Sequence, residues 1–453
     1  MAESTNTIQK EIQDREAKEK RELRRKRRRR NQILAILTLL LFVCLIVAII
    51  GTGVWYIMHR GAGKTAGGGA ATTEETTIDN LFESEDEIVK PEETNTEPAL
   101  TPEQQLDAIL DEAFISQMPL EDKVAGLFIV TPESITGVNK AVKAGDGTKD
   151  ALNKYAVGGI VYASQNMQDA AQFTEMVSNT TLYSRYALFT CVAEEGGSST
   201  SLEKAGLADK TNSEQAMGNG ADAAKAYEAS GKIADSMLTY GLNLNFAPVA
   251  DLATVQDSYL KDASYGSDAA LAASFVTSAV QGMQEKGISS CLKYFPGAAD
   301  MKEDPAKGMA TSERTAEQLA AEEFTVFKAG IDAGADMVMV GHVAVPALTG
   351  DNTPCSLSSA VITDKLRNEL GFNGVIITDA MNKGAITEYY EADEAAILAL
   401  KAGCDMILCP DDFEKAYNGV LEAVQNGTIS EERINDSLRR IYRIKYAGMM
   451  PEA

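Results

Sequence analysis

Apolar and polar residues alternate in two recurring patterns from about Thr101 to the end of the chain. Short runs rich in Val, Ile, Leu and Met are typical of parallel strands that are buried on both faces. Longer stretches with apolar residues three and four positions apart are typical of helices packed against a sheet. The eight predicted strands lie at 127–131, 159–163, 187–192, 242–246, 289–294, 337–341, 375–378 and 406–409.

Helical stretches separate these runs, at 221–240, 268–285, 316–333, 361–370 and 394–402 among others. A last stretch, 431–446, places Ile434, Leu438, Ile441 and Ile444 at helical spacing and predicts an amphipathic helix that closes the structure. Eight alternations of strand and helix indicate an α/β fold, and the number eight favours a (β/α)8 TIM-type barrel. An open doubly wound sheet is the alternative, because periodicity counts strands without closing them.

The seventh run ends abruptly at a carboxylate, Asp379, within the sequence GVIITDAM. In barrel enzymes the C-terminal ends of the strands carry the chemistry, so this strand is expected to deliver Asp379 into a cleft. The alternative is an aspartate that caps the next helix, which is common where a strand passes into a helix.

The N-terminal part shows a different pattern, a basic run followed by an uncharged apolar one. Residues 21–30 read RELRRKRRRR, and residues 33–58 contain no charged side chain. The apolar run exceeds the roughly 20 residues that span a bilayer, and it is too long for a cleaved signal peptide. The arginines are expected to hold the N-terminus in the cytoplasm, which places the barrel outside the cell. Contact of the basic run with anionic lipid fits this topology better than nucleic-acid binding.

Charge and composition divide the rest of the chain. Of the 42 basic and 66 acidic residues, 13 and 6 fall in residues 1–60, so the remainder is strongly acidic. The Gly-, Thr- and Glu-rich stretch that follows buries too little apolar surface to fold. The expected segments are a basic cytoplasmic tail (1–31), a transmembrane signal anchor (32–59), a flexible acidic linker (60–100) and the barrel (101–453).

Cysteine and histidine usage limits the chemistry of the barrel. Five cysteines follow the predicted anchor without the dense spacing of a disulfide framework, and those at 191, 291 and 404 lie in or beside apolar runs, where burial is expected. The chain has two histidines, His59 and His342, and no metal-ligand spacing. No glycine fingerprint follows the first predicted strand, so neither a nucleotide nor another cofactor is expected.

Four motifs at predicted strand ends resemble the N-terminal barrel domain of glycoside hydrolase family 3. They are GLNLNFAPVAD at 241–251, CLKYFPG at 291–297, VGHVAVPAL at 340–348 and FNGVIITDAMNKGAI at 372–386. The branch that they resemble most is the single-barrel β-N-acetylhexosaminidases, which release N-acetylglucosamine from cell-wall fragments. The resemblance runs from about Leu120 to Ala447 and implies a retaining O-glycosyl hydrolase.

The resemblance assigns Asp379 the role of nucleophile. A retaining glycosidase uses one ionised carboxylate to form a covalent glycosyl intermediate and a proton donor about 5 Å away. In this branch the donor is a histidine oriented by an aspartate, at the end of a loop that reads K-H-F-P-G-H-G-D and then D-S-H. Here Asp304 is kept, but Ala306 stands where that histidine is expected, and Tyr294 and Ala298 replace the other two.

The sugar-binding positions have changed as well. Where the family shows D-Q-E-G-G-R-V after the third strand, this chain reads AEEGGSS from Ala193, without the aspartate and arginine that hold the sugar. The remaining candidates for substrate contacts are Lys293, Glu194, Glu195, Asp300 and His342. His342 matches a family position on the pocket floor, and a hydrogen-bonded histidine near the core is an equally good interpretation.

Two functions therefore stay open. In the first, the protein is a membrane-anchored extracellular hydrolase of β-linked (N-acetyl)glucosamine-type cell-wall glycans, in which Asp304, Glu194, Glu195 or Glu303 replaces the histidine as general acid. Since general acid catalysis contributes ~10²–10⁴-fold, such an enzyme would be slow if no replacement existed. In the second, the barrel is a catalytically impaired relative that binds glycan or a protein partner at the cell surface.

Overall fold

The strands of this computed structural model, which describes residues 102–447 except 199 and 298–299, form a closed barrel. Each strand pairs in parallel with the next along the chain, and the first pairs with the last. The strands are β1 (Phe128–Val130), β2 (Gly159–Val161), β3 (Phe189–Val192), β4 (Leu244–Asn245), β5 (Ser289–Phe295), β6 (Met337–Val340), β7 (Val375–Ala380) and β8 (Met406–Leu408). All eight predicted runs are strands, and the closed barrel is confirmed over the open sheet.

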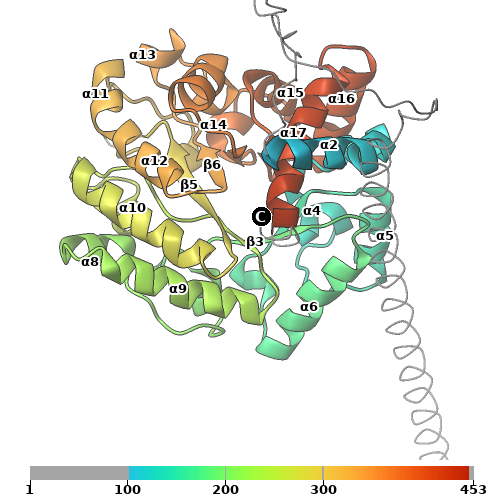
Figure 1. Ribbon diagram of the computed structural model, residues 1–453, viewed down its shortest axis with the longest axis horizontal. Helices are drawn as coiled ribbons and strands as arrows, with labels where there is room; N and C mark the ends of the chain where they lie inside the picture. The colour runs from blue at the N-terminus through green and yellow to red at the C-terminus, as the bar shows by residue number, and fades with distance from the viewer. Residues whose placement is uncertain (1–101, 199, 298–299, 448–453) are drawn as a thin grey trace, which may run out of the picture. The chain divides into compact units, whose positions relative to one another are not determined.

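Helices surround the barrel as an outer layer (Figure 1). The α-helices are α2 (Pro102–Ala113), α3 (Leu120–Ala125), α4 (Pro132–Thr136), α5 (Asp146–Lys154), α6 (Ala170–Tyr183), α7 (Ser201–Lys204), α8 (Glu214–Asn219), α9 (Ala224–Thr239), α10 (Ala269–Gln284), α11 (Ala316–Ala321), α12 (Glu323–Asp332), α13 (Pro346–Thr349), α14 (Gly384–Thr387), α15 (Ala392–Ala402), α16 (Phe413–Gln425) and α17 (Glu431–Tyr446). Short 3-10 turns are η1 (Ile115–Gln117), η2 (Ser164–Asn166), η3 (Lys261–Ala263), η4 (Pro305–Lys307) and η5 (Cys355–Leu357), and η6 (Ala360–Glu369) is a π-helix.

The predicted helical stretches are present. The stretch at 316–333 consists of two helices, α11 and α12, which are separated at Glu322. The guanidinium of Arg314 lies at this break and binds the carboxylates of both Glu322 and Glu323, each at 2.7 Å. Arg314, which lies before α11, therefore stabilises the junction between the two helices. The spacing of apolar residues within 316–333 does not predict this contact.

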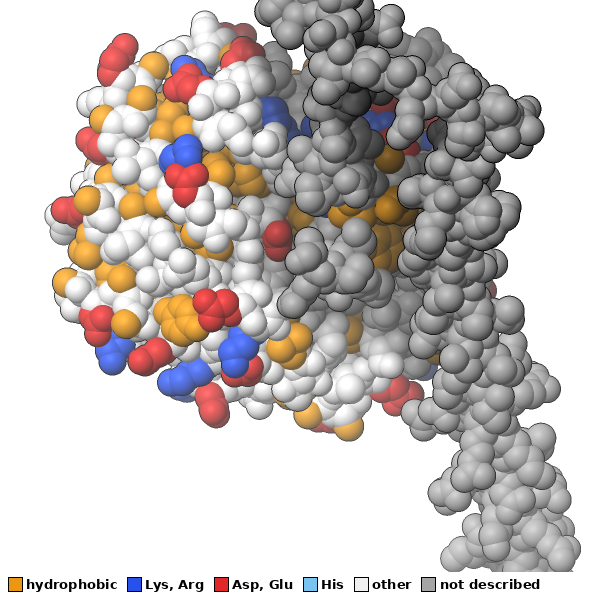
Figure 2. All heavy atoms as spheres, viewed as in Figure 1, with side chains coloured by type: hydrophobic (Ala, Val, Ile, Leu, Met, Phe, Trp, Pro, Cys, Tyr) orange, Lys and Arg blue, Asp and Glu red, His pale blue; other side chains and the backbone are white. Residues whose placement is uncertain are grey.

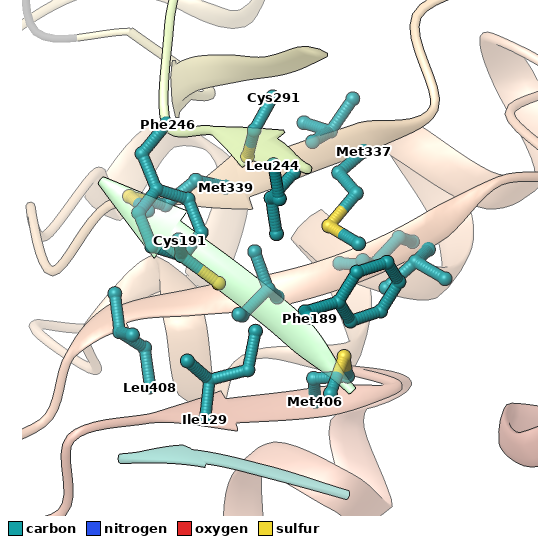
Figure 3. Packing of buried hydrophobic residues seen from close by; sticks show 14 of the residues in the cluster. Ile129, Phe189, Cys191, Leu244, Phe246, Cys291, Met337, Met339, Met406 and Leu408 are labelled. Atoms are coloured by element: carbon teal, nitrogen blue, oxygen red, sulfur yellow. The ribbon is translucent and has the colours of Figure 1, made fainter. Parts of the chain in front are cut away.

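Side chains from the strands fill the barrel interior (Figure 3). Phe189, Cys191, Leu244, Cys291 and Met339 are buried and belong to one contiguous apolar core. Layers of apolar side chains are the usual filling of such a barrel, so its centre is a packed core and not a channel. The cysteines in and beside the apolar runs are buried as expected, and the described cysteines are free thiols.

The last helix, α17, packs against the barrel, and the first described helix, α2, packs beside it (Figure 1). Ile434, Leu438 and Ile441 are fully buried, which confirms the predicted apolar face. The basic face is not simply solvated, because Arg439 and Arg443 form ion pairs with aspartates of α2. These contacts tie the point where the described chain begins to the helix that ends it.

Acidic and basic side chains are interspersed over the face shown in Figure 2, with small apolar patches between them. Within residues 102–447, apart from the gaps, no helix is both long and apolar enough to cross a bilayer. The predicted tail, membrane anchor and linker, including His59, lie outside the described residues.

Candidate active site

A cavity of about 270 Å³ opens at the C-terminal ends of the barrel strands. Residues of β5 and β7, residues that directly follow β6, and Glu195 shortly after β3 line it together with the loops after β4 and β5. The lining residues with polar side chains are Glu195, Tyr259, Tyr294, Asp304, His342, Asp379 and Lys383. This is the end of a barrel at which enzymes of this architecture place their chemistry.

Asp379 lies at the end of β7 with its carboxylate in this cavity and only 6% of its surface exposed. Its Oδ1 accepts a hydrogen bond from the backbone N–H of Ala380 at 2.7 Å, and its Oδ2 accepts one from Lys383 Nζ at 2.7 Å. Burial raises the pKa of Asp379, but the charge of Lys383 and these hydrogen bonds outweigh it and lower the pKa overall. The carboxylate is therefore ionised at neutral pH, as a nucleophile must be.

Lys383 was not predicted as a site residue. It precedes α14, four residues after Asp379, and its ammonium lies 5.4 Å from the centroid of the Tyr294 ring. The ammonium of Lys293 lies at the same distance from that ring. Burial and the nearby carboxylates of Asp379 and Glu195 raise the pKa of Tyr294 far above its ordinary value, so its hydroxyl stays protonated and can donate a hydrogen bond.

Glu195 and Lys293 form a buried ion pair on another wall of the site. Lys293 is 2% exposed and Glu195 8%, so each is held mainly by the other, and of the two only the glutamate lines the cavity. Glu214 lies close to both, with its carboxylate accepting the backbone N–H of Val249. Burial, together with the charge of Glu195, raises the pKa of Glu214 well above its ordinary value, which reduces the negative charge that surrounds Lys293.

The loop after β5 brings Asp304, Pro305 and Ala306 to the cavity. Asp304 caps η4, and its Oδ1 accepts the backbone N–H of Ala306 at 2.9 Å. At the position of the expected acid histidine the loop therefore offers only the methyl group of Ala306. Asp304 forms no ion pair with any described residue, unlike the cavity carboxylates of Glu195 and Asp379.

His342 is fully buried and held at both ring nitrogens. Its Nε2 lies 3.0 Å from the carbonyl oxygen of Ala380, which can only accept, so Nε2 carries the proton. Its Nδ1 lies 2.7 Å from the hydroxyl of Ser356 and accepts from it. Burial lowers the pKa of His342, which keeps the ring neutral. The ring fixes the end of β7, and its nitrogens are not free to protonate a leaving group.

Three of the expected substrate contacts do not line this cavity: Lys293, which pairs with Glu195 behind it, Asp300 and Glu194. Asp300 accepts hydrogen bonds from the Ser312 hydroxyl at 2.6 Å and the Glu313 N–H at 3.0 Å, so it stabilises the loop on which it lies. Glu194 points away from Glu195, because its Oε1 accepts the first backbone N–H groups of α7. Both carboxylates accept hydrogen bonds from nearby backbone N–H groups, and the sequence alone did not reveal these contacts.

Comparisons with known proteins agree with this geometry. The family model described as "Glycosyl hydrolase family 3 N terminal domain" matches residues 119–444, more than half of the chain. The chain belongs to glycoside hydrolase family 3.

Relatives of this family 3 barrel include a β-hexosaminidase of Stenotrophomonas maltophilia, 30% identical over 284 residues that cover 60% of this chain and 82% of the relative. Among solved structures, a family 3 β-N-acetylglucosaminidase from a Paenibacillus species matches with a TM-score of 0.69 and 32% identity, covering 74% of this chain and 64% of that one. A β-N-acetylhexosaminidase from Beutenbergia cavernae matches with a TM-score of 0.65 and 25% identity, covering 73% and 99%.

Three residues of the family 3 barrel that shape the cavity were missed from the sequence: Lys383, Tyr294 and Tyr259. Tyr294 was considered only as a lost histidine. Burial and the carboxylates of Asp251, Asp379 and Asp304 raise the pKa of Tyr259 well above its ordinary value, so it also presents a protonated hydroxyl. In the sequence, the only indication that Lys383 could pair with Asp379 is that it follows four residues later. That spacing brings the two side chains together only because the chain turns after β7.

Proposed function

We propose that this barrel is a retaining glycoside hydrolase of β-linked N-acetylglucosamine-type cell-wall glycans, held at the outer face of the membrane by residues 33–58. The observation that carries the proposal is Asp379, a buried carboxylate with a lowered pKa at the floor of a cavity at the strand ends. The cavity volume lies near the lower end of the roughly 300–1,000 Å³ common for small-ligand sites. This size suits one sugar ring above the carboxylate.

In the proposed mechanism Asp379 attacks the anomeric carbon, and the bond to the leaving oxygen breaks as a proton reaches it. Asp304 is the proposed proton donor, because it lines the cavity and no described lysine or arginine pairs with it. Glu195 is a weaker choice, since Lys293 occupies its carboxylate. The protonated hydroxyls of Tyr259 and Tyr294 are proposed to hold sugar hydroxyls in place of the missing aspartate and arginine.

The test is hydrolysis of chromogenic β-N-acetylglucosaminide and β-glucoside by the full-length protein in detergent. Asp379→Asn is expected to abolish turnover, and Asp304→Asn to lower it by about 10²–10⁴-fold, with a smaller loss for substrates whose leaving group needs no proton. Asp150→Asn is the matched control, because that carboxylate is exposed on α5 and does not line the cavity. Turnover that survives Asp379→Asn would exclude the proposed nucleophile.

A second candidate function is a catalytically impaired barrel that binds glycan at the cell surface. Two observations favour it: Lys383 occupies one oxygen of Asp379, and Ala306 provides no acid. Glycan binding by wild type without turnover on either substrate would support this candidate. Ala306→His would introduce an imidazole near Asp304. A gain of turnover in this variant would show that the missing imidazole is the cause of the low activity.

The membrane anchor has its own test. Fractionation of cells that express the full-length chain is expected to recover it with membranes, and protease added outside intact cells is expected to remove the barrel. Recovery of the chain in the soluble fraction, or protection of the barrel from protease, would contradict the proposed topology.

A further inference from the structure

The loop after β5 packs with its backbone directly against α14, the short helix that follows β7. A β-carbon added to Gly384, the first residue of α14, would meet three backbone atoms of this loop. It would lie 2.8 Å from the nitrogen of Gly308, 2.9 Å from the carbonyl carbon of Lys307 and 3.2 Å from the carbonyl oxygen of Ala306. Because all three atoms belong to the backbone, no side chain can turn away to make room. The two segments touch in this way only because residue 384 has no side chain.

The backbone conformation of Gly384 does not itself require glycine, because its φ angle lies outside the left-handed region. At such a position in a helix, alanine is ordinarily more favourable than glycine. The close approach of the loop is therefore the physical reason for a glycine at this position. Ordinary contact begins near 3.4 Å, so an added β-carbon would require a shift of about 0.5 Å or more.

The loop, and not α14, is the segment that such a shift would move. Ala385 and Ile386 of α14 are buried in the protein. The backbone N–H of Ile386 also donates to the carbonyl oxygen of Lys383 at 2.9 Å, which holds the first turn of the helix. Ala306 and Lys307 on the loop are exposed, so their displacement disturbs little packing.

Asp304 is tied to the same part of the loop and would move with it. Its Oδ1 accepts the backbone N–H of Ala306 at 2.9 Å, and its carbonyl oxygen accepts the backbone N–H of Lys307 at 2.9 Å. Catalytic groups must be held within about 0.5 Å of their productive position. A shift of the size that a β-carbon at Gly384 demands is therefore enough to misplace the carboxylate of Asp304.

We propose that Gly384 is a positioning residue of the hydrolase. Its lack of a side chain lets residues 306–308 pack against α14, and this contact fixes the Asp304 carboxylate at the cavity that holds Asp379. The inference rests on the proposed function, in which Asp304 is the proton donor. Consecutive residues at the start of α14 then serve both carboxylates, because Lys383 pairs with Asp379 and Gly384 supports the loop of Asp304.

Kinetics of the full-length protein in detergent test this role with two β-N-acetylglucosaminides. The phenyl glycoside needs a proton on its leaving oxygen, whereas the 2,4-dinitrophenyl glycoside does not. Gly384→Ala is expected to lower kcat/KM for the phenyl glycoside by about tenfold or more, and for the dinitrophenyl glycoside by no more than about threefold. Gly147→Ala in the first turn of α5, where the added carbon has nothing within 4 Å, is the matched control and should change neither value. Equal losses on the two substrates, or no loss, would overturn the proposal.

A double variant shows whether residue 384 acts through Asp304. Since Asp304→Asn already removes the proton donor, Gly384→Ala should cause no further loss of kcat/KM for the phenyl glycoside in that background. A further loss as large as in the wild type would make the role of Gly384 purely structural. Gly308→Ala disturbs the same contact from the loop side, because its φ angle of 149° disfavours a side chain, and it replaces Gly384→Ala if that variant does not fold.

Hydrogen exchange followed by mass spectrometry tests the contact itself and does not depend on turnover. In Gly384→Ala the peptide that contains residues 304–308 should exchange about tenfold faster or more than in the wild type or Gly147→Ala. Unchanged exchange would contradict the contact at Gly384, whether or not the barrel hydrolyses either glycoside. Absence of turnover in the wild type would instead contradict the proposed function, so the two failures are distinguishable.

Discussion

Replacement of Lys383 by methionine tests whether this lysine keeps the proposed nucleophile ionised. Its ammonium lies 2.7 Å from Asp379 Oδ2, and its side chain is 26% exposed, so solvent screens the pair only in part. An opposite charge at this range lowers the pKa of a carboxyl by about 1–3 pH units, and one pH unit corresponds to about 1.4 kcal/mol. We therefore expect the pKa of Asp379 to rise in Lys383→Met, because the charge that lowers it is removed.

The sign of the effect follows from which groups remain. In the wild type the pKa of Asp379 is lowered, so the stability that its ionised form contributes is present above its unfolded pKa and is lost as pH falls through the folded value. Without Lys383, burial is the largest remaining influence and raises the pKa, so the unfolded state releases this proton more easily than the folded one. The free energy of unfolding should then fall as pH rises through the unfolded pKa of about 3.9.

Two measurements follow this change. The acid limb of the pH–rate profile for chromogenic N-acetylglucosaminide should move to higher pH in Lys383→Met, and urea unfolding between acid and neutral pH should show the altered slope. Lys383→Arg keeps the charge and should behave like the wild type in both. Lys415→Met removes a lysine of α16 that pairs with Glu391 and Asp393 at the start of α15, far from the cavity lining, and is the matched control. An acid limb and a slope that do not move in Lys383→Met would refute the reasoning.

Two further variants test the supports of the site by urea unfolding. Lys293→Met leaves Glu195 buried without its partner and should lower the free energy of unfolding by about 3–5 kcal/mol. Lys328→Met breaks an exposed ion pair and should lower it by no more than about 1 kcal/mol. Similar losses for the two variants would contradict the buried ion pair. Ser356→Ala leaves Nδ1 of His342 without its donor and should cost about 1–3 kcal/mol, so an unchanged midpoint would show that the hydroxyl does not hold the ring.

The fold was predictable because its signal is repeated. Most of the eight strands are short runs of mainly apolar, buried residues, and their regular spacing along the chain gives the number that favours a barrel. The break within 316–333 was not visible in the spacing of apolar residues. Arg314 binds two adjacent glutamates at the break between α11 and α12, and hydrophobic spacing does not record such a contact.

The position of Asp379 was predictable because the strand itself fixes the side chain. Asp379 belongs to β7, so the strand determines its direction. Glu194 and Glu195 are consecutive residues after β3, but only Glu195 lines the cavity that holds Asp379, whereas Glu194 accepts backbone N–H groups of α7. The position of α7 depends on the course of the loop after β3, which the sequence pattern does not reveal, and for this reason Glu194 was expected at the substrate cavity.

The central claim is that Asp379 forms a covalent bond to the sugar. A fluorinated N-acetylglucosaminyl fluoride, whose ring fluorine slows breakdown of the intermediate, allows it to be trapped on the full-length protein and located by mass spectrometry of its peptides. The account predicts a single glycosyl group on the peptide that contains Asp379 and none in Asp379→Asn. A label on another carboxylate, or turnover of N-acetylglucosaminide without any label on Asp379, would contradict it.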